Sequence, residues 1–467
     1  MGKLFDEISK VAEETQPLHM PGHKRNTEIF TGRESRLLQP FYQYDMTEIA
    51  GTDDLHHAEG ILKEAQQRAA DLYGAGETFF LVGGSTLGVL AGISAVVPFG
   101  GTLLMPRCSH KSVYHVCGLR HITPLYMEGE KHPLLGFDEG ITPQDVEKVL
   151  LEGNKVDAVC ITSPTYEGRI LDVAGIAKVV HRYKLPLLVD SAHGAHLGVL
   201  SKESFPNATA CGADVVIHSL HKTLPAPTQT ALLHICSDKV DRQKVAYYLG
   251  VYETSSPSYP LLIGIDSCLS WVEQSGKKAW ENFCEKRIEL AKKLSSLQKI
   301  KVIDFFGGDG LDPCKMVLFD ASGSHGMEIA AALRDAGLEP ELTAPGYVLL
   351  ILTPCDGEEC YERLAKVVLT LDEKKWNQSQ IKFSPYRLPE RALSLFEGIE
   401  REMEMVPLME AAGRISGAMV MLYPPGQPMI VPGEIFSKEL LQQILGYEQA
   451  GLNITGLQNG LVQVVKE

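Results

Sequence analysis

The feature that most constrains the fold of this chain is the alternation of short apolar runs with helical patterns between about residues 50 and 250. The apolar runs lie at residues 79–82, 157–162, 185–189 and 213–218. Ile61 and Ala65 begin a helical spacing, and Thr142-Pro143 followed by Asp145 is typical of a helix N-terminus. Strands that alternate with helices form a mostly parallel sheet covered on both faces. The sequence therefore predicts an α/β fold.

The chain has 467 residues, which is too long for one typical domain. We expect an N-terminal segment (1–50), a large domain (51–270), a small α/β domain (271–375) and a C-terminal domain (376–467). The small domain is predicted from strands near 316–319 and 347–352 and helices near 327–335 and 361–371. The C-terminal domain is predicted from Pro- and Gly-rich stretches at 423–426 and 431–434, and the glycine-rich stretch 307–310 is expected to be a loop.

Composition excludes several classes of function. The formal net charge is -15, and no Lys/Arg-rich run offsets it, so a nucleic acid would be repelled. No apolar run reaches the roughly 18 residues of a membrane span, and the acidic N-terminus lacks the apolar stretch of a signal peptide. The ten cysteines include no C-x-x-C pair, which argues against a disulfide framework or a zinc site. We expect a cytoplasmic protein.

Three polar clusters follow predicted strands, where open α/β sheets bind their ligands. The first contains Gly84, Ser85 and Thr86, at the start of a predicted helix from Leu87. Free backbone N–H groups, the positive end of the helix dipole and two hydroxyls suit a phosphate. The same residues could instead only cap the helix.

The second cluster begins with Asp190, directly after an apolar strand. A buried carboxylate is costly unless a cation pairs with it, and a protonated pyridine nitrogen would be such a partner. His193 and His196 follow at a spacing that could suggest a metal, but no third ligand stands nearby. We therefore predict no metal site.

The third cluster is Ser219, His221 and Lys222, just past a buried strand. Lysine is seldom fully buried, and desolvation lowers its pKa, which favours attack of the amine on an aldehyde. A single lysine after a strand would usually be a surface residue. A phosphate cup, a carboxylate and a desolvated lysine, each at a strand end, are together what a pyridoxal-5'-phosphate (PLP) enzyme needs.

With these clusters and several further motifs, the chain from about residue 16 to 440 resembles the Orn/Lys/Arg decarboxylase family, in its short bacterial form, among the fold-type-I PLP enzymes. The motifs that carry the resemblance are residues 17–24 (PLHMPGHK), 51–56 (GTDDLH), 84–86 (GST), 109–112 (SHKS), 190–194 (DSAHG), 219–223 (SLHKT) and 432–434 (PGE). Gly83 stands where the family has Asn, a departure that a backbone contact could tolerate.

The resemblance implies a role for each matching residue. Lys222 would carry the cofactor, Asp190 would pair with its pyridinium nitrogen, and His110 would stack on its ring. Gly84, Ser85, Thr86, Ser219 and His221 would hold the phosphate. His193 would lie near the phenolic oxygen of the ring. The resemblance also implies a homodimer with active sites at the subunit interface.

The predicted function is decarboxylation of arginine, lysine or ornithine, which gives the corresponding amine, a precursor in polyamine biosynthesis, and CO2. The alternatives are another fold-type-I reaction, such as transamination or a lyase step, and a regulator that binds PLP without turnover, because a fold does not fix a reaction. The residues that bind the distal cation of the substrate are not identified by the motifs. The acidic candidates are Asp53, Asp54, Glu253 and Glu434.

Overall fold

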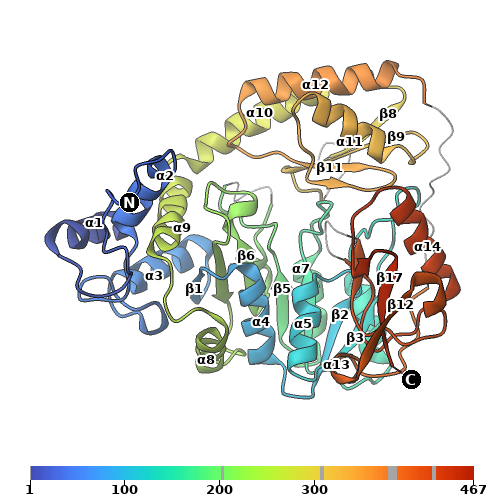
Figure 1. Cartoon of the computed structure of the whole chain (residues 1–467), viewed down its shortest axis with the longest axis horizontal. Helices are drawn as coiled ribbons and strands as arrows, with labels where there is room; N and C mark the ends of the chain where they lie inside the picture. The colour runs from blue at the N-terminus through green and yellow to red at the C-terminus, as the bar shows by residue number, and fades with distance from the viewer. Residues whose placement is uncertain (1, 201–204, 305–309, 377–386, 423–426, 467) are drawn as a thin grey trace. The chain divides into compact units, whose positions relative to one another are not determined.

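The computed structural model describes residues 2–200, 205–304, 310–376, 387–422 and 427–466 (Figure 1). The chain divides into two compact units. The first unit contains residues 1–96 and 186–281, and the second contains residues 97–185 and 282–467. Most of the predicted glycine-rich loop (307–309) and the Pro-rich stretch at 423–426 lie outside the described residues.

The strands of the first unit lie in the order β1 (Glu77–Leu81), β7 (Ala231–Ile235), β6 (Val215–Ser219) and β5 (Leu187–Asp190). β5 and β6 are parallel, and β7 is antiparallel to both β6 and β1. β1 therefore runs in the same direction as β5 and β6, and the carboxyl ends of these three strands lie at one edge. The strands predicted at 79–82, 185–189 and 213–218 are confirmed.

Helix α4 (Gly84–Val96) follows β1 and packs against β6 and β7 of the same unit. A Cβ at Gly88 would come within 2.8 Å of the Leu81 side chain, and one at Gly92 within 2.9 Å of the Leu188 side chain. Glycines four residues apart share one helix face, so their missing side chains let the helix approach the strands. The helix begins at Gly84 rather than at Leu87, which places Ser85 and Thr86 in its first turn.

The first unit also contains the helices that flank these strands in sequence. These are α1 (Leu4–Glu14), α2 (Ser35–Tyr44), α3 (Ile61–Tyr73), α8 (Arg242–Tyr252), α9 (Tyr259–Trp271) and the start of α10 (Lys277–Lys293). The helix predicted from the spacing of Ile61 and Ala65 is confirmed as α3. Among the described residues, no helix is both long and apolar enough to cross a membrane.

The second unit contains the parallel strands β4 (Ala158–Thr162), β2 (Thr102–Pro106) and β3 (Thr123–Met127), in this order. The helices α5 (Lys111–Leu119), α6 (Pro143–Leu151) and α7 (Val173–Arg182) alternate with them. At the start of α6, the Thr142 hydroxyl accepts from Asp145 N at 3.2 Å and the Asp145 carboxylate accepts from Thr142 N at 2.8 Å. The predicted helix N-terminus is therefore confirmed as a reciprocal cap.

The strands predicted near 316–319 and 347–352 and the helices predicted near 327–335 and 361–371 are present in the second unit. The antiparallel sheet that contains these strands has the order β10 (Leu342–Thr343), β11 (Val348–Ile351), β9 (Lys315–Asp320) and β8 (Ile300–Ile303), with helices α11 (Gly326–Asp335) and α12 (Glu358–Glu373). The C-terminal region contains α13 (Leu395–Glu400), α14 (Lys438–Gln449) and two small sheets, β12-β17-β16 and β14-β13-β15. Their strands are β12 (Met403–Pro407), β13 (Val420–Leu422), β14 (Gln427–Ile430), β15 (Ile454–Thr455), β16 (Leu457–Gln458) and β17 (Leu461–Val465).

Candidate active site

Two hydrogen bonds join the three predicted clusters at the carboxyl edge of the first unit's sheet. Ser219, the last residue of β6, donates through its hydroxyl to Ser85 Oγ in the first turn of α4, at 2.7 Å. Lys222 Nζ lies 3.1 Å from His193 Nε2, in the segment that follows β5. Residues from three separate stretches of sequence therefore converge, as expected for the ends of strands that run in one direction.

Lys222 lies in a short 3-10 turn (η3, Leu220–Lys222) directly after β6. The side chain is half-buried rather than enclosed, so the desolvation predicted for this lysine is only partial. The neighbouring imidazole of His193 is 5% exposed. An imidazole at hydrogen-bond distance from an amine can take up or return a proton, which is the exchange that a reactive lysine requires.

Asp190 is the last residue of β5 and is 4% exposed. Its Oδ1 accepts from the backbone N–H of Ala192 at 3.2 Å. Burial raises the pKa of Asp190, while the positive charge of Lys222 and the Ala192 N–H act in the opposite direction. A carboxylate held in this way stays costly until a further cation reaches it.

The turn between β1 and α4 has the shape of an anion site. Gly84 has φ +77°, a left-handed conformation that favours glycine, and a Cβ there would meet only Gln229 O at 3.8 Å. The first N–H groups of a helix have no partner within the helix, and its dipole is positive at this end. Thr86 is exposed, and His221 Nδ1 contacts Thr230 O at 3.1 Å.

His110 belongs to the second unit, where it is the N-cap of α5. Its Nδ1 lies 2.9 Å from Ser112 Oγ and 3.3 Å from Ser112 N, and the side chain is half-buried. The hydrogen bonds to Ser112 fix the orientation of the ring. Its role as a stacking partner of the cofactor stays a prediction, as do the roles of the other site residues and the expected absence of a metal.

Three of the acidic candidates for the distal cation accept hydrogen bonds from backbone N–H groups of the first unit: Asp53, Asp54 and Glu253. The Asp53 carboxylate accepts N–H groups of four residues between 54 and 62 at 2.9–3.1 Å. Asp54 accepts from His56 N at 2.8 Å and contacts His57 Nδ1 at 3.2 Å. Glu253 Oε2 accepts the N–H groups of residues 82 and 83 at 3.0 and 3.1 Å.

Glu434, the fourth candidate, lies in the second unit and is paired within the chain. Arg107 donates to both oxygens of Glu434, at 2.9 and 2.8 Å, and the Glu434 side chain is 2% exposed. Val431 N donates to the same carboxylate at 2.9 Å. This carboxylate has a cationic partner of its own and is therefore a poor receptor for another cation.

The second unit also contains a cavity of about 440 Å³ that the motifs did not indicate. Glu167 lies on its wall and is 5% exposed. The residue stands in a turn after β4, where Gly168 N donates to Thr165 O at 3.0 Å. A polar residue just after a buried strand was the available sequence signal, but without a motif around it the signal was too weak to use.

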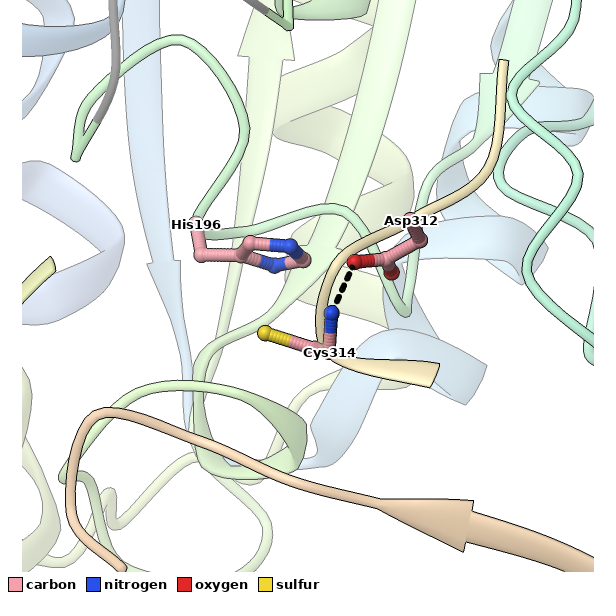
Figure 2. Close-up of side chains that lie close together, drawn as sticks. All are labelled: His196, Asp312 and Cys314. Atoms are coloured by element: carbon pink, nitrogen blue, oxygen red, sulfur yellow. Dashed lines mark hydrogen bonds between the residues drawn. The ribbon is translucent and has the colours of Figure 1, made fainter. Parts of the chain in front are cut away.

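A second loop holds the Glu167 turn in place. Asp312 N donates to Gly168 O at 2.7 Å, and a Cβ at Gly168, whose φ is +107°, would come within 2.7 Å of the Lys315 side chain. Figure 2 shows the bond that fixes this loop, from Cys314 N to Asp312 Oδ1 at 2.8 Å. Only glycine fits at position 168, so the direction of the Glu167 side chain is set by the backbone.

Comparison with known proteins identifies the family. The model of the Orn/Lys/Arg decarboxylase major domain matches residues 4–317, and that of the C-terminal domain of the same family matches residues 377–462. The chain belongs to the Orn/Lys/Arg decarboxylase family.

Two relatives and one solved structure illustrate the similarity. The chain is 33% identical to the uncharacterised protein YaaO of Bacillus subtilis (strain 168), over 94% of this chain and 92% of the relative. It is 31% identical to an arginine decarboxylase of Bacillus anthracis, over 96% of this chain and 93% of the relative. Its fold matches that of lysine decarboxylase A from Pseudomonas aeruginosa with a TM-score of 0.83 at 19% identity, over 100% of this chain and 80% of that structure. The predicted fold class is therefore confirmed.

Proposed function

We propose that the chain is a PLP-dependent decarboxylase of a basic amino acid: arginine, lysine or ornithine. Membership of the family supports the reaction and the cofactor. The observation that carries the proposal is the position of Lys222, whose Nζ lies 3.1 Å from His193 Nε2 and whose charge acts on the buried Asp190. Arginine is the first substrate to test, because the Bacillus anthracis relative is named an arginine decarboxylase.

The residues of the first unit have the donors and acceptors that PLP requires. The Ser85 and Ser219 hydroxyls and the first turn of α4 would hold the phosphate, and Asp190 would face the ring nitrogen. Thr223 follows Lys222, is 2% exposed, and its hydroxyl has no hydrogen-bond partner among the described residues. A buried hydroxyl without a partner is costly, so a polar group that binds beside Lys222 is favoured there.

When bound, PLP supplies an electron sink for the electron pair that the departing carboxylate leaves on Cα. Asp190 would hold a proton on the ring nitrogen, since a buried carboxylate gains most from a cation at contact distance. Lys222 Nζ would hold the cofactor before the substrate amine arrives, and its freed amine would return a proton to Cα. His193, at 3.1 Å from that amine, would set its protonation.

Several finer features are also proposed. His110 would stack on the cofactor ring, and Gly84, Thr86 and His221 would contribute to the phosphate site. The enzyme would act as a homodimer in the cytoplasm and supply amines for polyamine biosynthesis. Its domains would be the segment 1–50, the PLP-binding domain 51–270, the small domain 271–375 and the C-terminal domain 376–467.

A panel of labelled amino acids tests the reaction. Release of CO2 with formation of the matching amine is expected from one of arginine, lysine and ornithine. A keto acid as product would indicate transamination instead, and bound PLP without turnover would indicate a regulator. Reduction with borohydride followed by peptide mapping is expected to place the pyridoxyl group on Lys222, and a label on another lysine would contradict the assigned site.

A further inference from the structure

The cavity in the second unit is suited in size and lining to a small organic molecule. Its volume of about 440 Å³ falls in the range of ligand pockets. Apolar side chains of Leu135, Phe137 and Leu342 contribute to the walls, together with the ring of Tyr347. The rings of Phe137 and Tyr347 meet edge to face, with their centroids 5.4 Å apart. These side chains also belong to, or pack against, one hydrophobic cluster, so the walls are firmly supported.

Glu167 is the buried charged group of this cavity. The Tyr347 hydroxyl donates to Glu167 Oε1 at 2.9 Å. Among the residues that the structure describes, the other oxygen, Oε2, is buried and has no hydrogen-bond partner. Such a carboxylate leaves a large part of its desolvation cost uncompensated. An added donor that reaches Oε2 would therefore be bound with a gain in free energy.

The charges around Glu167 favour a cation. Burial raises the pKa of Glu167 to about 7, Tyr347 and Lys315 oppose this change, and repulsion from Asp138 adds to it. Burial also raises the pKa of Asp138, and it raises the pKa of the Cys108 thiol far enough to keep it neutral. The other charged residues on the lining are Arg107, which is paired with Glu434, and the exposed Glu128, Lys131 and Arg387.

A metal ion is a poor match for this arrangement. Among the described residues, no third ligand group of the second unit lies close enough to Glu167 and Asp138 to complete a metal-binding cluster. A hydrated ion would also gain nothing from the apolar walls. An organic cation gains twice, because its charge meets the carboxylate while its carbon chain displaces water from Leu135, Phe137 and Tyr347.

We propose that this cavity binds the cationic end of a basic amino acid or of the amine made from it, with the Glu167 carboxylate as counter-ion. This inference rests on the proposed function, which supplies the class of ligand. The cavity wall includes Pro106 to Cys108, and the chain reaches His110 two residues later. The guanidinium or ammonium group donates to Oε2, and the alkyl chain lies along the apolar wall.

The test uses butylguanidine, which has the cation and the apolar chain but neither an amine nor a carboxylate. Binding to the full chain, reconstituted with PLP, is measured by calorimetry at pH 6 and pH 8. The affinity is expected to rise up to about tenfold over this interval, because the carboxylate ionises through a pKa of about 7. Glu167→Gln should weaken binding about tenfold or more at pH 8 and remove the pH dependence.

Glu128→Gln is the matched control, since Glu128 is an exposed carboxylate on the same lining. It should keep both the affinity and the pH dependence. Tyr347→Phe removes the hydrogen bond that favours the ionised Glu167, so the pH midpoint of binding should move upward. This second variant decides the matter if Glu167→Gln does not fold. Absence of butylguanidine binding, or parental binding by a folded Glu167→Gln, would overturn the proposal.

Inhibition of decarboxylation separates the two sources of the cation. Competition of butylguanidine with arginine that is lost in Glu167→Gln means that the cavity receives the side chain of the substrate. Non-competitive inhibition that is lost in the same variant means that the cavity binds the amine apart from the reacting substrate. If Glu167-dependent binding is found but no amino acid is decarboxylated, the proposed function fails and the site remains. If decarboxylation is found and Glu167→Gln binds butylguanidine like the parent, the site fails and the function remains.

Discussion

Asp190 in the first unit and Glu167 in the second are both buried carboxylates, one at the end of a parallel strand and the other in the turn that follows one. Burial raises the pKa of each. Several polar groups surround Asp190. The Ala192 N–H donates to it, the charge of Lys222 acts on it, and His193 lies beside that lysine. Around Glu167 lie the hydroxyl of Tyr347, which donates to it, and a cavity with several apolar side chains on its wall, while the charge of Lys315 also acts on the carboxylate.

This difference distinguishes the surroundings that a reacting group needs from those that a ligand-recognising group needs. A reacting group needs neighbours that move protons and hold charge, and these have to be close and fixed before the ligand arrives. A recognition group needs the opposite, because a carboxylate already paired, as Glu434 is with Arg107, has little to gain from a ligand. The buried carboxylate that lacks a cation at contact distance is the one that can distinguish ligands by charge.

The largest expected effect comes from removing the amine of the first unit. Lys222→Ala should lower decarboxylation by at least about 10⁴-fold, because covalent attachment is lost together with a proton transfer worth about 10² to 10⁴. Turnover of the best substrate and the visible absorbance of bound cofactor measure both losses. Lys244→Ala, on the exposed face of α8, is the control and should leave both unchanged. Substantial residual turnover would break the assignment of the first unit to chemistry.

The next effect tests whether Asp190 acts by charge. Asp190→Asn keeps the shape but not the charge that holds the ring proton, a loss of roughly 3–5 kcal/mol. That corresponds to a fall in rate of about 10² to several times 10³. The measurement is single-turnover decarboxylation alongside the absorbance of the cofactor, which should still bind.

Asp214→Asn is the matched control for Asp190. Asp214 is fully buried and accepts from Leu187 N at 2.8 Å, at the opposite end of β5 and β6. Its loss should lower stability and leave the single-turnover rate of the folded enzyme unchanged. If Asp190→Asn turns over within a fewfold of the parent, Asp190 is not the partner of the pyridinium nitrogen, and the second cluster is structural.

A smaller effect is expected on the pH dependence of folding stability, through Glu167. Folding raises the pKa of Glu167 from about 4.5 to about 7. The contribution of this group to the free energy of unfolding is therefore fully present below pH 4.5 and is lost as the pH rises through 7. The parent should therefore lose about 2–3 kcal/mol of folding free energy between pH 5 and pH 8 through this group. Glu167→Gln should lack that loss, which urea unfolding at the two pH values measures. An unchanged difference between variant and parent would mean that Glu167 is well solvated.

The sequence indicated the residues around Asp190 and Lys222 more clearly than it indicated Glu167, for a physical reason. The strand ends around Asp190 and Lys222 carry several polar residues in a row, and strands of one direction place such residues together. Glu167 has no such motif around it, and its hydrogen-bond partner Tyr347 is far from it in sequence. Contacts of that kind depend on how distant segments pack, and no local pattern contains them.

The acidic candidates for the distal cation also show that a local sequence pattern does not reveal the contacts of a side chain. Asp53 and Glu253 were credible receptors for a cation because of their charge and their neighbouring motifs. In the folded chain they accept backbone N–H groups, and a carboxylate used in this way stabilises a turn. The predicted start of α4 at Leu87 was late by three residues, because Gly84 in a left-handed conformation lets the helix begin directly after the turn.

The smallest expected effect concerns a single link inside the first site. Ser219 donates to Ser85 Oγ at 2.7 Å and so orients a hydroxyl of the proposed phosphate site. Ser219→Ala removes one hydrogen bond worth about 0.5–1.5 kcal/mol, and PLP affinity should fall by up to about tenfold. Equilibrium titration of cofactor absorbance measures it. Ser94→Ala, in the same helix as Ser85, is the control. It removes a hydrogen bond of 3.1 Å to the Tyr252 hydroxyl and should not change PLP affinity. Equal affinities for Ser219→Ala and the parent would mean that the Ser85–Ser219 bond only joins the strand to the helix.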